Sequence, residues 1–353
     1  MKKFFKWFFI VVGVIILILA IIIVGYFISH DRYGFFPTGG ELSELQQNYD
    51  AVYYDLNLEI NNEEQSINGY VIVGVKSLIN NLETIELDLV DNFDVTKVES
   101  NKQDLKFEHG DQKLLISLSE SLTQNQYKEF IVYYCGQPLE AIRPPWIGGF
   151  NWSKDSNDND WIGVSCQGEG GKIWFPCKAH PADEPDSVAI NVTVPEQYYC
   201  ASNGVLQKIS QPKPGYKTFR WLTKYNTNNY NISINIAKYD IIKKSYTSIK
   251  GNTVPVVYYY LNDPTEKADS LVDMAIDMLR SLEKYYGEYP FAKEKFGLAE
   301  TSYWGMEHQT INSYGNNYLY TEREGFKFDR LMLHEMTHEW WGNKVTVKDW
   351  ADF

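Results

Sequence analysis

The chain has 353 residues, which is enough for two domains of ordinary size, each with its own core. Its formal net charge of −13 argues against nucleic acid as a partner, because nucleic acids attract basic surfaces. The 26 tyrosines and 10 tryptophans are typical of a large β-rich ectodomain and not of a disordered tail.

Residues 1–30 are predicted to anchor the chain in a membrane. Three lysines within the first six residues precede an uncharged run from Trp7 to Ser29. As a helix rising about 1.5 Å per residue, this run can span roughly 30 Å of hydrocarbon. The positive flank predicts a single pass, with the N-terminus in the cytoplasm and everything after Ser29 exported to the extracellular or periplasmic side. A cleaved signal peptide is the alternative, but it would have a shorter apolar region and an A-x-A-like site.

A juxtamembrane linker and a β domain are predicted to follow. Residues 31–47 contain the turn-forming sequence Pro37-Thr38-Gly39-Gly40, as expected of a linker. In residues 48–249, apolar and polar residues alternate and no convincing helix intervenes. This alternation indicates antiparallel strands that cover a core on one side. The clearest alternating segments are Tyr54 to Ile60, Ile85 to Leu89 and Val188 to Val194.

The β domain contains all four cysteines, Cys135, Cys166, Cys177 and Cys200. Their spacing is not that of a zinc knuckle. Outside the cytosol they would form up to two disulfides, with Cys166 and Cys177 as one candidate pair, although the sequence leaves the pairing open.

The pattern changes after Ile249, and residues 250–353 are predicted to form an α+β domain. An apolar stripe predicts a helix that Asp263 caps and Gly287 ends. A second helix is predicted from near Phe326 to Gly342. The strands expected before it include residues 254–261, 296–301, 310–314 and 317–320.

The second helix contains the pattern His334-Glu335-x-x-His338. The two histidines are four residues apart, so they project from one helical face and can bind the same metal ion. Zinc accepts imidazole nitrogens at about 2.0–2.1 Å, which suits ligands from adjacent turns. Glu335 projects roughly 100° away from His334 and can therefore act as a general base on an activated water. Histidine is scarce in this chain, with six in all, which favours a metal site over two ordinary surface histidines.

Three motifs follow one another along the chain. In the β domain, Ser165-Cys166-Gln167-Gly168 leads to Trp174-Phe175-Pro176-Cys177. Next comes Trp304-Gly305-Met306-Glu307-His308, which looks like a G-x-M-E-N motif, and then the segment from His334 to Asn343. In this order they resemble the aminopeptidase N (membrane alanyl aminopeptidase) family of gluzincin metallopeptidases. The resemblance covers nearly everything from Ala51 to Phe353.

The resemblance implies an α+β multidomain fold, with an antiparallel, saddle-shaped β domain before the first part of a thermolysin-like catalytic domain. It also implies a zinc-dependent aminopeptidase that acts on peptides with a free N-terminus. His334 and His338 would bind Zn²⁺, and Glu335 would activate the water.

The same resemblance assigns substrate contacts. Glu307 would bind the free α-amino group and so restrict cleavage to the first residue. Gln167 would lie near the same amine and the first side chain. The backbone of Gly305 and Met306 would lie along the substrate as an edge strand does.

The chain departs from the family pattern at three places. Trp304 replaces the usual glycine, which is expected to reshape the pocket for the first side chain, and His308 replaces a frequent asparagine. The family's third zinc ligand is a glutamate that follows the second histidine after eighteen residues. Counted from His338, it would fall four residues beyond Phe353, so the chain is expected to stop just before it.

Two hypotheses therefore remain. In the first, the chain represents a membrane-anchored zinc aminopeptidase whose sequence is incomplete. In the second, it is an inactive homologue that acts as a membrane-anchored module binding peptides or proteins. An epoxide-opening enzyme of the leukotriene-hydrolase type shares the motifs but fits an N-terminal anchor poorly.

Overall fold

The computed structural model describes residues 7, 12–22, 38–261 and 264–352. The chain divides into two units, residues 1–36 and residues 37–353. Residues 12–22 of the first unit are helical. Most of the predicted anchor over residues 1–30, and residues 31–37 of the predicted linker over residues 31–47, lie outside the described residues. None of the described helices combines the length and the apolar character that a membrane crossing requires.

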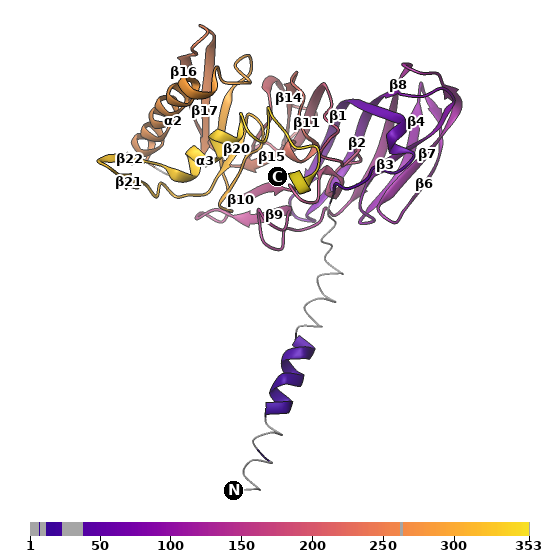
Figure 1. The fold of residues 1–353 in the computed structure, drawn as a ribbon, viewed down its shortest axis with the longest axis horizontal. Coiled ribbons are helices and arrows are strands. Elements are labelled where there is room, and N and C mark those ends of the chain that lie inside the picture. Colours follow the sequence, from indigo (N-terminus) through magenta and orange to yellow (C-terminus); the bar gives the residue numbers. More distant parts are fainter. Residues whose placement is uncertain (1–6, 8–11, 23–37, 262–263, 353) are drawn as a thin grey trace. The chain divides into compact units, whose positions relative to one another are not determined.

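The second unit begins with a β part, as the alternating sequence predicts (Figure 1). Its largest sheet has the order β13-β14-β11-β1-β2-β8-β4-β5. The bounds are β1 Tyr49–Asn61, β2 Ser66–Ser77, β4 Phe93–Ser100, β5 Gln103–Asp104, β8 Tyr127–Gly136, β11 Ser187–Pro195, β13 Val205–Ser210 and β14 Tyr216–Thr223. Antiparallel pairing dominates this sheet, but β1 and β11 pair in parallel, which the sequence did not predict.

Two smaller sheets complete the β part. One has the order β3-β7-β6 and the other the order β12-β15-β10-β9. Their bounds are β3 Leu82–Asp88, β6 Lys106–Gly110, β7 Lys113–Leu122, β9 Gly149–Lys154, β10 Asp160–Ser165, β12 Tyr199–Ser202 and β15 Ile234–Ala237. Between residues 50 and 249, all of them described, the only helical segments are the short 3₁₀ turns η2 (Gly171–Ile173) and η3 (Asn229–Asn231).

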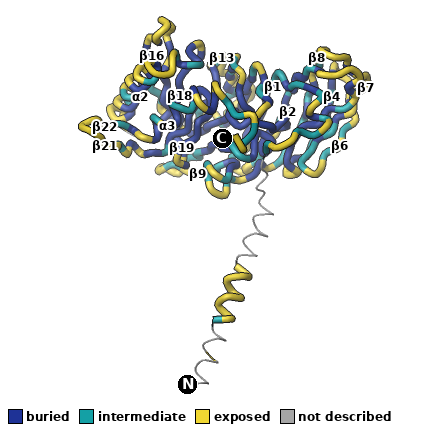
Figure 2. The backbone as a smooth tube through the Cα atoms, in the orientation of Figure 1, coloured by how far each residue is buried: buried dark blue, intermediate teal, exposed yellow. Residues whose placement is uncertain are grey.

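The burial of β1 shows why its sequence alternates. Tyr54, Leu56, Leu58 and Ile60 are buried, and the residues between them are partly exposed. In β11, which lies between β1 and β14, six of the nine residues are buried, and the buried run from Val188 to Val192 is continuous. Figure 2 shows the same contrast over the whole unit, with exposed turns around buried strands.

The chain then forms a five-stranded sheet with the order β16-β17-β18-β20-β19. Its strands are β16 Asp240–Thr247, β17 Thr253–Tyr260, β18 Phe296–Glu300, β19 Gly305–Met306 and β20 Asn312–Tyr314. The strand predicted over residues 317–320 is wrong, because these residues form a turn and a short irregular segment. The sheet begins at β16, which precedes the division predicted at residues 249 and 250.

Helix α2 (Thr265–Tyr286) packs against β16 and β17. Leu271, Ala275 and Leu279 are fully buried in the core that this helix shares with the sheet. Each large apolar side chain buried in this way contributes about 1.5–3 kcal/mol. The predicted stop at Gly287 is confirmed, since its φ is +85° and its N–H donates to the Glu283 carbonyl. Asp263, the predicted cap, lies outside the described residues, and Pro264 occupies the N-cap position.

Helix α3 (Arg330–His338) is shorter than predicted at both ends. At its start, β22 (Phe326–Phe328) pairs with β21 (Thr321–Arg323) as a hairpin. Asp329 then caps the helix by accepting a hydrogen bond from the Met332 N–H. At its end, the Glu339 N–H donates to the Met336 carbonyl three residues back, so the last turn tightens before Gly342.

All four cysteines are free thiols in this structure. The candidate disulfide between Cys166 and Cys177 is therefore not formed. Both side chains are fully buried in the β part, and burial raises the pKa of each thiol.

Candidate active site

Helix α3 brings the two predicted metal ligands together. The rings of His334 and His338 lie with their centroids 4.7 Å apart and nearly perpendicular to each other. Both line a cavity of about 610 Å³. The Nδ1 atom of His338 lies 2.9 Å from the Trp341 carbonyl oxygen, so Nε2 is the nitrogen that this ring would offer to a metal.

Glu335 lines the same cavity and is 4% exposed. Burial, and then the nearby carboxylate of Glu307, raise its pKa well above the ordinary value. A bound cation would act in the opposite direction, because it favours the ionised carboxylate. A carboxylate in such a site is suited to accept and then release a proton.

Gly305 allows Glu335 to lie this close to the sheet. A Cβ atom at Gly305 would stand 2.2 Å from Oε1 of Glu335 and 2.8 Å from Leu331 of the same helix. The backbone of strand β19 therefore contacts helix α3 without an intervening side chain.

The edge of the sheet faces the cavity. β19 is the last strand of the five-stranded sheet and pairs with β20 alone. Gly305, Met306 and Glu307 all line the cavity. An extended peptide could therefore add to this edge. The substrate contacts that the resemblance implies for Gly305 and Met306 stay predictions.

Glu307 is held by side chains of the β part. It is 5% exposed, and its Oε1 accepts hydrogen bonds from Gln167 Nε2 (2.8 Å) and the Tyr230 hydroxyl (3.0 Å). Asn343 Nδ2 donates to its backbone carbonyl at 2.8 Å. The structure thus joins Gln167 and Glu307, 140 residues apart in sequence, as predicted. Tyr230 was missed, because it lies in the turn η3 and no motif marks it.

Two tryptophans form one side of the cavity. Trp304 and Trp146 are 55% and 57% exposed, and their rings lie 6.3 Å apart. The guanidinium of Arg143 lies 5.0 Å from the Trp146 ring. Trp304 lines the cavity, and its effect on the pocket for the first side chain stays a prediction. Its partner Trp146 carried no signal in the sequence.

His308 serves the packing of the sheet. Its side chain is fully buried, and burial lowers its pKa to about 3, so the ring is neutral. Its Nδ1 lies 3.2 Å from the Ser313 hydroxyl of β20. The ring therefore occupies the interior and does not line the cavity.

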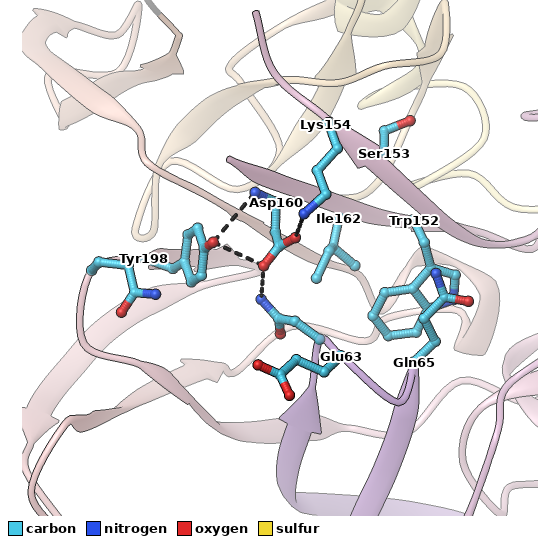
Figure 3. Close-up of a pocket in the computed structure, with 10 residues that line it drawn as sticks. Glu63, Gln65, Trp152, Ser153, Lys154, Asp160, Ile162 and Tyr198 are labelled. Carbon is cyan, nitrogen blue, oxygen red and sulfur yellow. Dashed lines mark hydrogen bonds and ion pairs between the residues drawn. The ribbon is translucent and has the colours of Figure 1, made fainter. Parts of the chain in front are cut away.

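A second cavity, of about 460 Å³, lies in the β part and is lined by other residues (Figure 3). Asp160 is at its centre and accepts hydrogen bonds from Asn62 Nδ2 and the Tyr198 hydroxyl, both at 2.8 Å. Lys154 adds an ion pair with the same carboxylate. Because the carboxylate is already engaged by these neighbours, the arrangement is that of a structural network.

The histidine pair tests whether zinc fits this chain. Two imidazoles on one helical face are donors that zinc accepts, and two donors leave coordination positions open. Within residues 38–261 and 264–352, no group of three histidine, cysteine, aspartate or glutamate side chains is placed to hold one metal ion. Among the described residues, His334 and His338 are thus the two that would bind the metal.

The close approach at Gly305 generates a prediction. Gly305→Ala should displace the Glu335 carboxylate and lower by about a hundredfold the rate of the peptide hydrolysis that is proposed below, because small misplacements of a catalytic group are costly. Gly110→Ala is the control, since a Cβ atom there meets nothing within 4 Å. Initial rates and thermal unfolding of both variants check this. Equal rates in the two variants would contradict it.

The comparisons with known proteins agree with this geometry. Residues 50–252 match the Peptidase M1 N-terminal domain, and residues 271–353 match the Peptidase family M1 domain. Endoplasmic reticulum aminopeptidase 1 of Mus musculus is 24% identical over 189 residues, which are 51% of this chain and 20% of that protein. Probable aminopeptidase 1 of Saccharolobus solfataricus is 23% identical over 295 residues, which are 81% of this chain and 35% of that protein.

A solved structure shares the fold. The M1 zinc metallopeptidase of Deinococcus radiodurans superposes with a TM-score of 0.70 at 23% identity, over 87% of this chain and 68% of that chain. The present chain spans between about a fifth and about a third of the length of the two relatives above. The two family matches together cover most of its residues, so the chain belongs to peptidase family M1.

Proposed function

We propose that this chain acts as a zinc aminopeptidase, removing the first residue from peptides. One observation carries the proposal. The histidine pair, the buried Glu335 and the Glu307–Gln167 pair all line one cavity beside an unpaired sheet edge. The M1 matches support it, and the relatives named above are aminopeptidases.

His334 and His338 would hold the zinc through their ring nitrogens. Zinc supplies a Lewis acid that acidifies water and polarises a carbonyl group. Glu335 lies within the same cavity and would take the proton of the attacking water, then deliver it to the leaving amine. Its burial favours proton acceptance over a permanent charge.

Glu307 would select the substrate's terminus. An ammonium group beside its carboxylate makes a charge-assisted contact, which is stronger than a neutral hydrogen bond. Gln167 and Tyr230 orient the carboxylate from the β part. Because the ammonium must occupy this position, the peptide bond that reaches the histidines is the first one. We assign this β part to residues 48–249 and the catalytic part to residues 250–353.

The metal helix is tested by separating zinc affinity from turnover. His334→Ala and His338→Ala should each weaken zinc binding by more than about a hundredfold, since each removes a direct ligand. Glu335→Gln should keep zinc binding and lower hydrolysis by a factor of roughly 10²–10⁴. Competition with a chromophoric chelator measures the zinc affinity. His109→Ala, in the β part, is the control.

A wild-type chain that binds peptides and zinc without cleaving any peptide would contradict the hydrolase proposal. It would instead support the binding-module hypothesis.

The proposed role of Glu307 is tested by comparing peptides whose N-terminal amine is free or acetylated. Glu307→Gln should raise KM for a peptide with a free N-terminus by about tenfold or more, because the charge of the carboxylate is lost. The parent should cleave the N-acetylated peptide hardly at all. Steady-state kinetics on the free and acetylated peptides check both points. Equal cleavage of the two peptides by the parent would rule out an aminopeptidase.

We also propose that residues 1–30 anchor the chain as a single-pass segment, with the N-terminus cytoplasmic and the catalytic part exported. The support is the uncharged run from Trp7 to Ser29 behind three lysines. Extraction of membranes with alkaline carbonate should leave the chain in the pellet.

Leu17→Arg combined with Ile21→Arg should release the chain into the supernatant, because each arginine near the bilayer centre costs about 2.5–3.5 kcal/mol. A wild-type chain that is itself released by carbonate would contradict the anchor.

A further inference from the structure

Arg330 is a cation on the wall of the catalytic cavity. It is the first residue of α3, and its side chain is exposed. Within the described part of the chain it has no hydrogen bond, ion pair or ring contact with another side chain. Two nearby cations, Arg323 and Lys327, do contact other side chains. Arg323 lies 3.8 Å from the Glu324 carboxylate, and Lys327 lies over the Tyr320 ring.

The helix itself does not require this charge. A cation in the first turn faces the positive end of the helix dipole, which disfavours it. The helix is instead capped by Asp329, whose oxygens accept hydrogen bonds from the Met332 N–H, the Tyr314 hydroxyl and Asn316 Nδ2. The charge of Arg330 therefore does not stabilise the helix, whereas its position places it in the lining of the cavity.

Helix α3 and strand β19 fix the direction in which a bound peptide would run through the cavity. Arg330, His334 and His338 follow one another at intervals of four residues and so share one face of α3. Gly305 lies against Leu331 and Glu335, whereas the Glu307 backbone is bonded to Asn343, beyond the C-terminal end of the helix. From Glu307 back to Gly305, the strand β19 thus runs toward the end of the helix where Arg330 lies.

A peptide that pairs antiparallel to β19 would run the same way. With its ammonium at Glu307 and its first carbonyl at the histidines, its second and third residues would approach Arg330. Arg330 and His338 are eight residues apart, or about 12 Å along the helix. Three extended residues span roughly 10 Å, and the arginine side chain covers the remaining distance.

We propose that Arg330 binds a substrate carboxylate that lies close to the free N-terminus of the peptide. The ligand is either the terminal carboxylate of a dipeptide or tripeptide or an acidic side chain just after the first residue. The planar guanidinium suits a carboxylate, which it can bind through two parallel hydrogen bonds. A negative end at Glu307 and a positive end at Arg330 complement a short zwitterionic peptide. The inference rests on the proposed aminopeptidase function.

Binding without turnover separates this inference from that function. Calorimetric titration of the zinc-loaded full chain carrying Glu335→Gln would use three probes. They are the tripeptide Leu-Gly-Gly, its C-terminal amide, and the amide of Leu-Asp-Gly. We expect at least one carboxylate-bearing probe to bind about tenfold more tightly than Leu-Gly-Gly amide. A preference for Leu-Gly-Gly identifies the terminal carboxylate, and a preference for Leu-Asp-Gly amide identifies the side chain.

Arg330→Gln in the same background should abolish this preference and leave the affinity for Leu-Gly-Gly amide unchanged. Arg330→Lys should restore part of it. Arg323→Gln is the matched control, because it removes an arginine from the adjacent hairpin that does not line the cavity. In the parent with Glu335 intact, Arg330→Gln should raise KM for the preferred probe and leave kcat nearly unchanged.

The outcomes separate a failure of the role proposed for Arg330 from a failure of the aminopeptidase proposal. If the peptides bind equally well whether or not they carry a carboxylate, or if the preference survives Arg330→Gln, the role of Arg330 is overturned and the aminopeptidase proposal stands. If none of the probes binds, the aminopeptidase proposal fails, and the role of Arg330 fails with it.

Discussion

The position of helix α3 depends on one buried carboxylate, that of Glu339. This side chain has no exposed surface, and its oxygens accept hydrogen bonds from the Asn312 amide (2.8 Å), the Thr310 N–H (3.1 Å) and the Asn343 amide (3.2 Å). The Tyr289 hydroxyl adds a fourth donor at 3.2 Å. Burial raises its pKa to about 7, although the donors favour the ionised form. Glu339 follows His338 directly, yet it connects the helix to the sheet and does not line the cavity that contains the histidines.

A second buried charge joins the β part to the catalytic part. Lys295 Nζ donates to the carbonyls of Ser202 and Gly204, at 2.9 and 2.6 Å, and lies 4.9 Å from the Trp221 ring. Burial lowers its pKa to about 7. Because the two parts share polar interior contacts of this kind, residues 37–353 form one compact unit. The site lies at their junction, where Gln167 and Tyr230 of the β part hold Glu307 of the catalytic part.

Much of this arrangement follows from local patterns in the sequence. Alternation predicted β1, because one face of this strand packs on a core, and it also predicted β11, although there both faces are buried from Val188 to Val192. The four-residue spacing of His334 and His338 needs only helical geometry. The ends of α3 were wrong because the hairpin β21–β22 and the Asp329 cap override the apolar pattern around Phe326. Gln167 was found through a family motif. Tyr230 and Trp146 were not, because their proximity to the site is created by tertiary packing. Arg330 shares the helical face of the two histidines, but no motif marks it.

The hydrogen bonds on Glu307 have a mechanical consequence. Two of the donors that hold it come from the β part, while the helix with the histidines belongs to the other part. A rotation of a few degrees between the parts would pull these donors away before it disturbed the histidine pair. For the proposed aminopeptidase, recognition of the amine would then be lost while the capacity for hydrolysis remained. In that enzyme the position of cleavage would depend on how the two parts are aligned, and substitutions far from the metal helix would change it.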